Sequence, residues 1–95
     1  MDRAEFESRL REQGYQEIAH REMPAHQIND AHAHDFDAQL LILHGEMTIV
    51  RDGLAHSYRS GDTFDMPSGT RHEERAGPEG VRYIAGRRRH AAAAG

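Results

Sequence analysis

His32 and His34 flank a single alanine, and this His-x-His spacing is the first feature of the sequence that could do chemistry. Side chains alternate between the two faces of a β-strand, so residues two apart face the same way. Two neutral imidazoles on one face can bind a single divalent metal ion. The spacing alone is a weak signal, because a pair of surface histidines has the same pattern.

A third histidine, His72, follows a segment with regularly placed turn residues. Gly61 and Asp62 favour a turn before a short strand, and residues 67–69, Pro-Ser-Gly, favour a second turn. His72 then begins the next expected strand. Taken alone, this histidine is as consistent with a structural role as with metal binding.

The two segments together resemble the two sequence motifs of the cupin superfamily, in which a His-x-His pair and a later histidine follow fixed glycines and a proline. The resemblance covers residues 26–76 and implies that three histidines bind a divalent transition metal ion, one of Zn, Fe, Ni, Mn or Cu. The matching residues are His32, His34 and Gly45 in the first motif, and Gly61, Pro67, Gly69 and His72 in the second.

Three positions depart from the superfamily pattern, the first being the opening glycine of the first motif, which falls at His26. The glutamate of the first motif falls at Ala38 or Gln39, depending on the spacing, and the asparagine of the second falls at Ala76. The fourth ligand could be Gln39, or Asp37 if the strand is bulged there. Three imidazoles without a carboxylate leave open coordination positions, as a catalytic site requires.

Glu74 lies two residues after His72 and should face the same interior. A carboxylate near a metal ion could act as a general base or complete the coordination, whereas an internal ion pair with Arg71 or Arg82 is the structural alternative. Further residues of inward parity should line a small apolar pocket. They are Leu40, Ile42, Phe64 and Met66.

The elements that position these residues are mostly short strands. Residues 2–13 are expected to form an amphipathic helix, capped by Asp2 and stopped at Gly14. Beyond Gly14, short runs separated by turn residues are typical of a β-sandwich or barrel. The expected strands are 15–23, 27–34, 39–44, 47–51, 55–59, 63–66, 71–76 and 81–85.

With the resemblance, these elements predict an all-β fold, a small single-domain cupin β-barrel that is jelly-roll-like and carries a short N-terminal α-helix. The expected divisions are a helix at 1–14, the barrel at 15–90 and a disordered tail at 91–95. Residues 40–43 are apolar on both faces of their strand, so either the helix or a second subunit must cover the outside. We expect a homodimer.

Composition excludes several classes of function. The chain has no cysteine, which removes disulfides and thiolate chemistry. Its net charge of −4 argues against nonspecific nucleic-acid binding. No apolar run approaches the roughly 18 residues that span a membrane, and the N-terminus lacks a signal pattern, so a cytoplasmic protein is expected. Residues 87–89 are three arginines that could bind phosphate, although a solvated strand end is the simpler explanation.

The expected function is that of a metal-binding small cupin acting on a small molecule. The resemblance allows dioxygenase or isomerase chemistry, but a fold does not imply a reaction. The alternative is a non-catalytic module that binds or senses a small ligand, which the missing glutamate and asparagine favour slightly.

Overall fold

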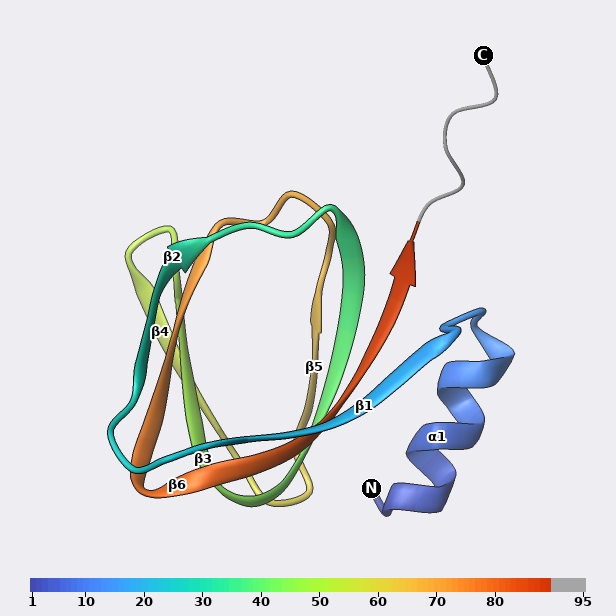
Figure 1. Cartoon of the computed structure of the whole chain (residues 1–95), viewed down its shortest axis with the longest axis horizontal. Helices are drawn as coiled ribbons and strands as arrows, with labels where there is room; N and C mark the ends of the chain where they lie inside the picture. The colour runs from blue at the N-terminus through green and yellow to red at the C-terminus, as the bar shows by residue number, and fades with distance from the viewer. Residues whose placement is uncertain (90–95) are drawn as a thin grey trace.

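The computed structural model describes residues 1–89 of the chain, so the predicted tail at 91–95 lies outside the described residues. Strands predominate and are preceded by one helix, which confirms the predicted fold class. In chain order the elements are α1 (Arg3–Glu12), β1 (Glu17–Met23), β2 (Ile28–His32), β3 (Phe36–Arg51), β4 (Leu54–Arg59), β5 (Thr63–Met66) and β6 (His72–Arg89) (Figure 1).

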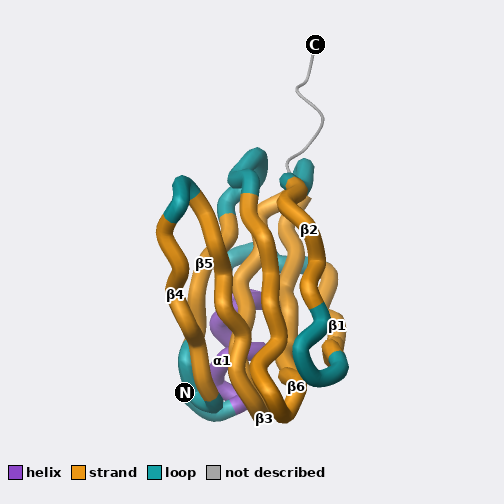
Figure 2. Tube along the Cα trace, turned by 90° about the vertical axis from the view of Figure 1, so that its left-hand side faces the viewer, coloured by secondary structure: helices purple, strands orange, loops and turns teal. Residues whose placement is uncertain are grey.

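Two long strands, β3 and β6, pair with each other along most of their length and organise the fold. The outer edge of β6 pairs first with β2 and then with β1, while β3 pairs first with β5 and then with β4. All of these pairings are antiparallel. The strands curl round a central space, as Figures 1 and 2 show from two directions.

The prediction that each long strand would be two separate strands is wrong. Gly45 pairs with Val81 and Met47 pairs with Ala76, so residues 77–80 lie opposite Glu46 alone. Gly45 has a φ of 84°, and a Cβ atom there would lie 2.0 Å from the carbonyl oxygen of Gly80. The glycines therefore bend both strands at the same level without ending them, because only glycine tolerates this backbone approach.

This shared bend divides the sheet into two halves. The covered half consists of β1, β5, residues 36–45 of β3 and residues 81–89 of β6. The bare half consists of β2, β4, residues 47–51 of β3 and residues 72–76 of β6. The interior of the molecule lies between the two halves.

The helix α1 packs on the outer face of the covered half. Asp2 caps its first turn by accepting a hydrogen bond from the backbone N–H of Glu5 at 2.9 Å. Phe6 and Leu10 are buried against Leu41 and Ile84 in a separate apolar cluster. The predicted apolar outer face is thus covered by the chain's own helix, which removes this reason to expect a second subunit.

The bare half has polar side chains on its outer face. Thr48 and Ser57 share a hydrogen bond of 2.8 Å across β3 and β4, and Arg75 forms an ion pair with Glu73 on β6. Alternation of apolar inward and polar outward residues is the ordinary pattern of an antiparallel sheet with one solvated face.

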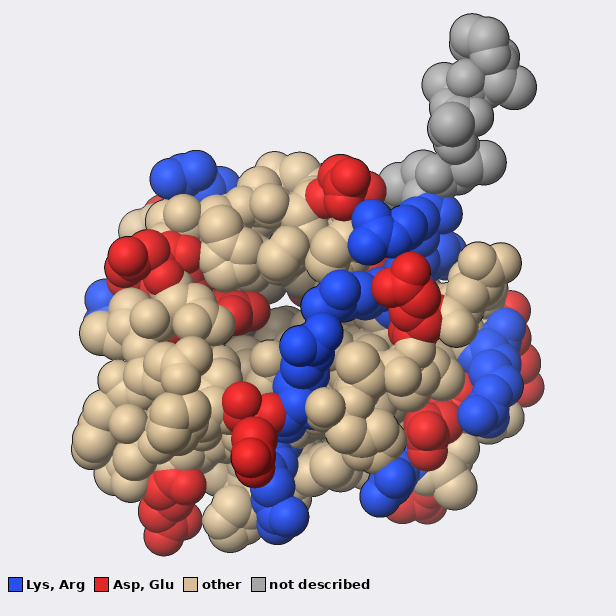
Figure 3. Space-filling view, viewed as in Figure 1, with Lys and Arg blue, Asp and Glu red and all other residues tan. Residues whose placement is uncertain are grey.

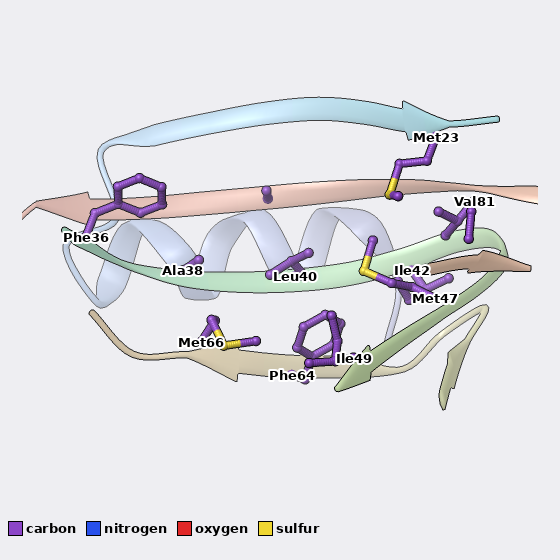
Figure 4. Close-up of a cluster of buried hydrophobic side chains, with 12 residues drawn as sticks. Met23, Phe36, Ala38, Leu40, Ile42, Met47, Ile49, Phe64, Met66 and Val81 are labelled. Atoms are coloured by element: carbon purple, nitrogen blue, oxygen red, sulfur yellow. The ribbon is translucent and has the colours of Figure 1, made fainter. Parts of the chain in front are cut away.

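The inward side chains of both halves form the larger apolar core, shown in Figure 4. Its largest members come from β3 and β5, with Tyr58 and Tyr83 packed at its border. Tyr58 stacks on Phe64 with ring centroids 4.2 Å apart. The ten-residue α1 is the one helix of residues 1–89, and no helix in this part of the chain is long and apolar enough to span a membrane.

Candidate metal centre

The three histidines of the sequence motifs meet at one end of the interior. His32 ends β2 and is the cross-strand partner of His72, which begins β6, while His34 lies in the short connection to β3. Each offers one ring nitrogen to a cluster in which these atoms lie within 4.8 Å of one another. The ring centroid of His32 lies 4.6 Å from that of His34 and 4.5 Å from that of His72.

Backbone carbonyl groups orient two of the three imidazoles. The Nδ1–H of His32 donates to the carbonyl oxygen of Asp30 at 2.7 Å, and the Nδ1–H of His72 donates to that of Thr70 at 3.0 Å. A carbonyl oxygen can only accept, so Nδ1 carries the proton in both rings. The lone pair of each neutral ring is therefore on Nε2, which faces the cluster.

His34 completes the group from the loop. Its Nε2 lies 3.1 Å from Nε2 of His32, and its ring stacks on Phe36 with centroids 4.6 Å apart. Burial, reinforced by the neighbouring His32 and His72, lowers the pKa of His34 below 6.5. A neutral imidazole is the form that binds a metal ion.

Among residues 1–89, Glu74 is the one carboxylate that lines the cavity beside this triad. Its Oε2 lies 3.4 Å from Nε2 of His72, and its Oε1 accepts a hydrogen bond of 2.8 Å from Nδ2 of Asn29. Burial opposes its ionisation, but hydrogen bonds from His72 in its protonated form and from Asn29 prevail and lower the pKa of Glu74. The same contact with Glu74 raises the pKa of His72. The alternative ion pair of Glu74 with Arg71 or Arg82 is absent among residues 1–89.

The two residues suggested as a fourth ligand lie on the other face of β3. Gln39 donates hydrogen bonds to Gln13 and Tyr15 beneath the helix, and Asp37 forms an ion pair with Arg88 at 2.9 Å. The first segment of β3 runs from Phe36 without a register shift before Ile42, so no bulge turns either side chain inward. Ala38, between them, faces the interior.

A cavity of about 220 Å³ opens beside the triad. Of the pocket residues expected from the sequence, Leu40, Phe64 and Met66 line it. Ile42 shares their inward direction but lies in the packed core at 1% exposure and does not line the cavity. Both halves of the sheet contribute to its wall.

Comparison with known proteins rests on structure. No protein-family model and no curated protein matches the sequence. Solved structures do match, among them an RmlC-like cupin from Shewanella frigidimarina (TM-score 0.68, 20% identity, 77% of this chain and 65% of that one). The chain has the cupin fold.

Two further solved structures match with similar scores. One is a protein of unknown function from Rhizobium leguminosarum, with TM-score 0.72, 20% identity and coverage of 77% of this chain and 69% of that one. The other is KdgF from a Halomonas species, with TM-score 0.64, 19% identity and coverage of 77% and 68%. The chain spans about two thirds of the length of these structures.

Several residues that line the cavity were not expected from the sequence. Asn29 is the cross-strand partner of Glu74, and Arg87 shares the inward parity of Ala85 on β6. Arg21, the partner of Tyr83 on β1, also lines the cavity. The alternation of side chains along a strand could have predicted that Arg87 faces inward, but only if β6 had been predicted as a single strand.

Proposed function

We propose that this cupin-fold protein binds a divalent transition metal ion through His32, His34 and His72 and acts on a small molecule in the adjoining cavity. The observation that supports the proposal is the convergence of three imidazoles, two of which are oriented by backbone carbonyl groups. In residues 1–89, His72 is the one polar or charged residue classed as buried, at 2% exposure. Its Nδ1 is paired with the carbonyl oxygen of Thr70, and its Nε2 lies 3.4 Å from Glu74 within the histidine cluster.

The donor atoms suit one small cation. Two imidazole nitrogens bound at about 2.0–2.1 Å to the same ion lie roughly 3.0–3.4 Å apart. The 3.1 Å between the Nε2 atoms of His32 and His34 falls in that range. Imidazole ligands suit Zn²⁺, Fe²⁺, Ni²⁺ and Cu²⁺, and a neighbouring carboxylate also accommodates Mn²⁺. Such an ion would supply Lewis-acid polarisation of a substrate oxygen, or redox chemistry if it were iron or copper.

Glu74 takes the role of the carboxylate that the first motif lacks. It stands on β6 instead of β3, where its oxygen contacts the site-facing nitrogen of His72. Asn29 holds the other oxygen and so fixes the carboxylate. From this position Glu74 can complete the ligand set or accept a proton from a bound small molecule.

The test is the metal content of tag-free protein, measured by mass spectrometry after reconstitution with each of the five metals. We expect close to one ion per chain in the parent protein. His32→Ala, His34→Ala and His72→Ala should each lower the affinity by at least about 100-fold, and Glu74→Gln by about 10-fold to 100-fold.

His56→Ala is the matched control, because His56 is exposed on β4 and outside the cluster. It should keep the parental metal content. Amide NMR spectra establish that each variant is folded. Folded parent protein that takes up no metal would overturn the proposal, as would loss of metal in the control alone.

A non-catalytic ligand-binding module is the second candidate. It is favoured by Ala38, which occupies the position of a motif carboxylate and lines the cavity. Glu74 separates the two candidates. If the protein is a dioxygenase or isomerase, Glu74→Gln should abolish turnover of a bound substrate, whereas a binding module should hold its ligand unchanged over time.

A homodimer stays a prediction of this proposal. The measurement is light scattering of the eluting protein, which distinguishes the 10.7 kDa chain from twice that mass.

A further inference from the structure

Two arginines line the cavity without an anionic partner. Arg21 on β1 and Arg87 on β6 belong to its wall, together with the histidine triad. The side chain of neither forms an ion pair or a hydrogen bond with any of residues 1–89. Figure 3 shows the hollow on this face of the molecule with basic side chains along one edge.

Arg87 differs from the two arginines that follow it. Arg88 points to the outer face, where it forms an ion pair with Asp37 and donates to the carbonyl oxygen of Gln13. Arg89 forms ion pairs with Glu17 and Asp35. Two arginines of this run, Arg88 and Arg89, therefore have acidic partners. Arg87 faces the cavity and has no acidic partner among residues 1–89.

Phe36 connects Arg87 to the candidate metal site. The guanidinium carbon of Arg87 lies 4.8 Å from the centre of the Phe36 ring. His34 stacks on the same ring at 4.6 Å. A cation held over an aromatic ring is restrained in position, and its N–H donors remain available in the plane of the guanidinium group.

We propose that the cavity binds a compact organic monocarboxylate, with its carboxylate at Arg21 and Arg87 and the rest of the molecule toward the histidine triad. Planar guanidinium groups bind carboxylates through paired hydrogen bonds. The guanidinium groups of Arg21 and Arg87 line the cavity, and the planar fork of each can offer paired N–H donors to the two oxygens of a carboxylate. The apolar side chains beside them suit an organic carboxylate better than inorganic phosphate.

The apolar part of the wall and the size of the cavity limit the rest of the ligand. Leu40, Phe64 and Met66 offer apolar surface to a short carbon chain or one ring. The volume of about 220 Å³ is smaller than the roughly 300–1,000 Å³ typical of sites for drug-sized ligands. The inference rests on the proposed function in that it takes this cavity as the ligand site.

The experiment is an amide NMR titration with three acids, 2-hydroxybutyrate, 2-oxobutyrate and benzoate, each beside its neutral amide, and with inorganic phosphate. At least one acid should bind tenfold more tightly than its amide and than phosphate, and it should shift resonances of cavity residues. Arg87→Gln and Arg21→Gln should each weaken that acid at least tenfold. Arg82→Gln removes an arginine that does not line the cavity and should change nothing.

Three results would overturn the inference: no acid preferred over its amide, phosphate bound more tightly than every acid, or equal weakening by Arg82→Gln. The titration is run on chelator-treated protein and on Zn²⁺-loaded protein. Arginine-dependent binding without metal uptake would refute the metal proposal and keep this one. Metal uptake with no preference for acids would do the reverse.

Discussion

The two halves of the sheet share β3 and β6 but are built differently. The covered half is apolar on both faces, because Leu41 and Ile84 pack outward against α1 while Leu40 and Ala85 face the interior. The bare half is not covered by the helix, and its inner face combines core side chains such as Met47 and Ile49 with the polar His72 and Glu74. Its outer face carries polar groups such as Thr48 and Glu73.

The site chemistry follows the same division. His32, His72, Glu74 and Asn29 all belong to the bare half, whereas Arg21 and Arg87 belong to the covered half. A strand that is solvated on one face can place polar side chains inward when they bond one another, as Glu74 and Asn29 do. The difference indicates that the covered half supplies most of the stability and the bare half most of the candidate metal ligands.

The largest expected effect is at the bend between the halves. Gly45→Ala should destabilise the protein by roughly 3 kcal/mol or more, because alanine is strained at positive φ and its Cβ would collide with the backbone of Gly80. Urea unfolding measures the change. Gly53→Ala is the control, since it also has positive φ but no atom within 4 Å of a Cβ. Equal losses in the two variants would show that the close approach at Gly45 is unimportant.

The second prediction compares outward residues of the two halves. Ile84→Ala should reduce the free energy of unfolding by about 3 kcal/mol, because the side chain is fully buried beneath α1. Thr48→Ala should reduce it by about 0.5 kcal/mol, the usual contribution of an exposed hydrogen bond. Urea denaturation of both variants gives the ratio. Comparable losses would contradict the proposed division of stability.

The third prediction concerns pH and the bare half. In chelator-treated protein the imidazole of His72 should titrate above pH 6.5 and that of His34 below it, since Glu74 stabilises the first cation and burial disfavours the second. Carbon-13 NMR of the histidine rings measures both. Glu74→Gln should lower the pKa of His72, and an unchanged value would show that another group raises it.

The contact between His72 and Glu74 also makes the stability of the fold depend on pH. The pKa of His72 is raised in the folded state, so its contribution is complete below 6.5 and is lost as pH rises through the folded value. The pKa of Glu74 is lowered, so its contribution is present above 4.5 and is lost as pH falls through the folded value. Metal-free protein should therefore gain most from this pair between about pH 4.5 and 6.5.

The smallest expected effect distinguishes neighbouring arginines of β6. Arg88→Gln should slightly lower the urea concentration at the midpoint of unfolding, because Arg88 forms an ion pair with Asp37 and donates a hydrogen bond to the carbonyl oxygen of Gln13. Arg87→Gln should leave that midpoint unchanged, since Arg87 lacks such partners among the described residues. A lower midpoint for Arg87→Gln than for Arg88→Gln would contradict the assignment of the two side chains to different faces.

Local signals in the sequence predicted much of the fold. Asp2 caps the helix as expected, and β5 spans the predicted residues 63–66. The apolar run at 40–43 correctly predicted a covered outer face. The turn residues Gly45 and 77–80 wrongly predicted strand ends. Glycine and proline there produce a bend instead, because a long neighbouring strand continues the pairing.

The site was less accessible to sequence reasoning than the fold. The three histidines of the motifs lie together, because His32 and His72 are cross-strand partners and His34 follows in the connection to β3. The side chains of Gln39 and Asp37 have their partners on the outer face of β3, at Tyr15 and Arg88. The partners of Glu74 and Arg87 are cross-strand or through-ring contacts, and only the assembled sheet specifies them.

The backbone carbonyls of Asp30 and Thr70 have a consequence for how this site can change over evolution. Each stands two residues before the histidine that it orients, so the direction of that imidazole is determined within a tripeptide. Because the acceptor is a main-chain atom, substitution of either side chain leaves it in place. The ring nitrogens that face the histidine cluster can therefore persist while the residues around them diversify, and a new ligand specificity can arise from the cavity wall alone.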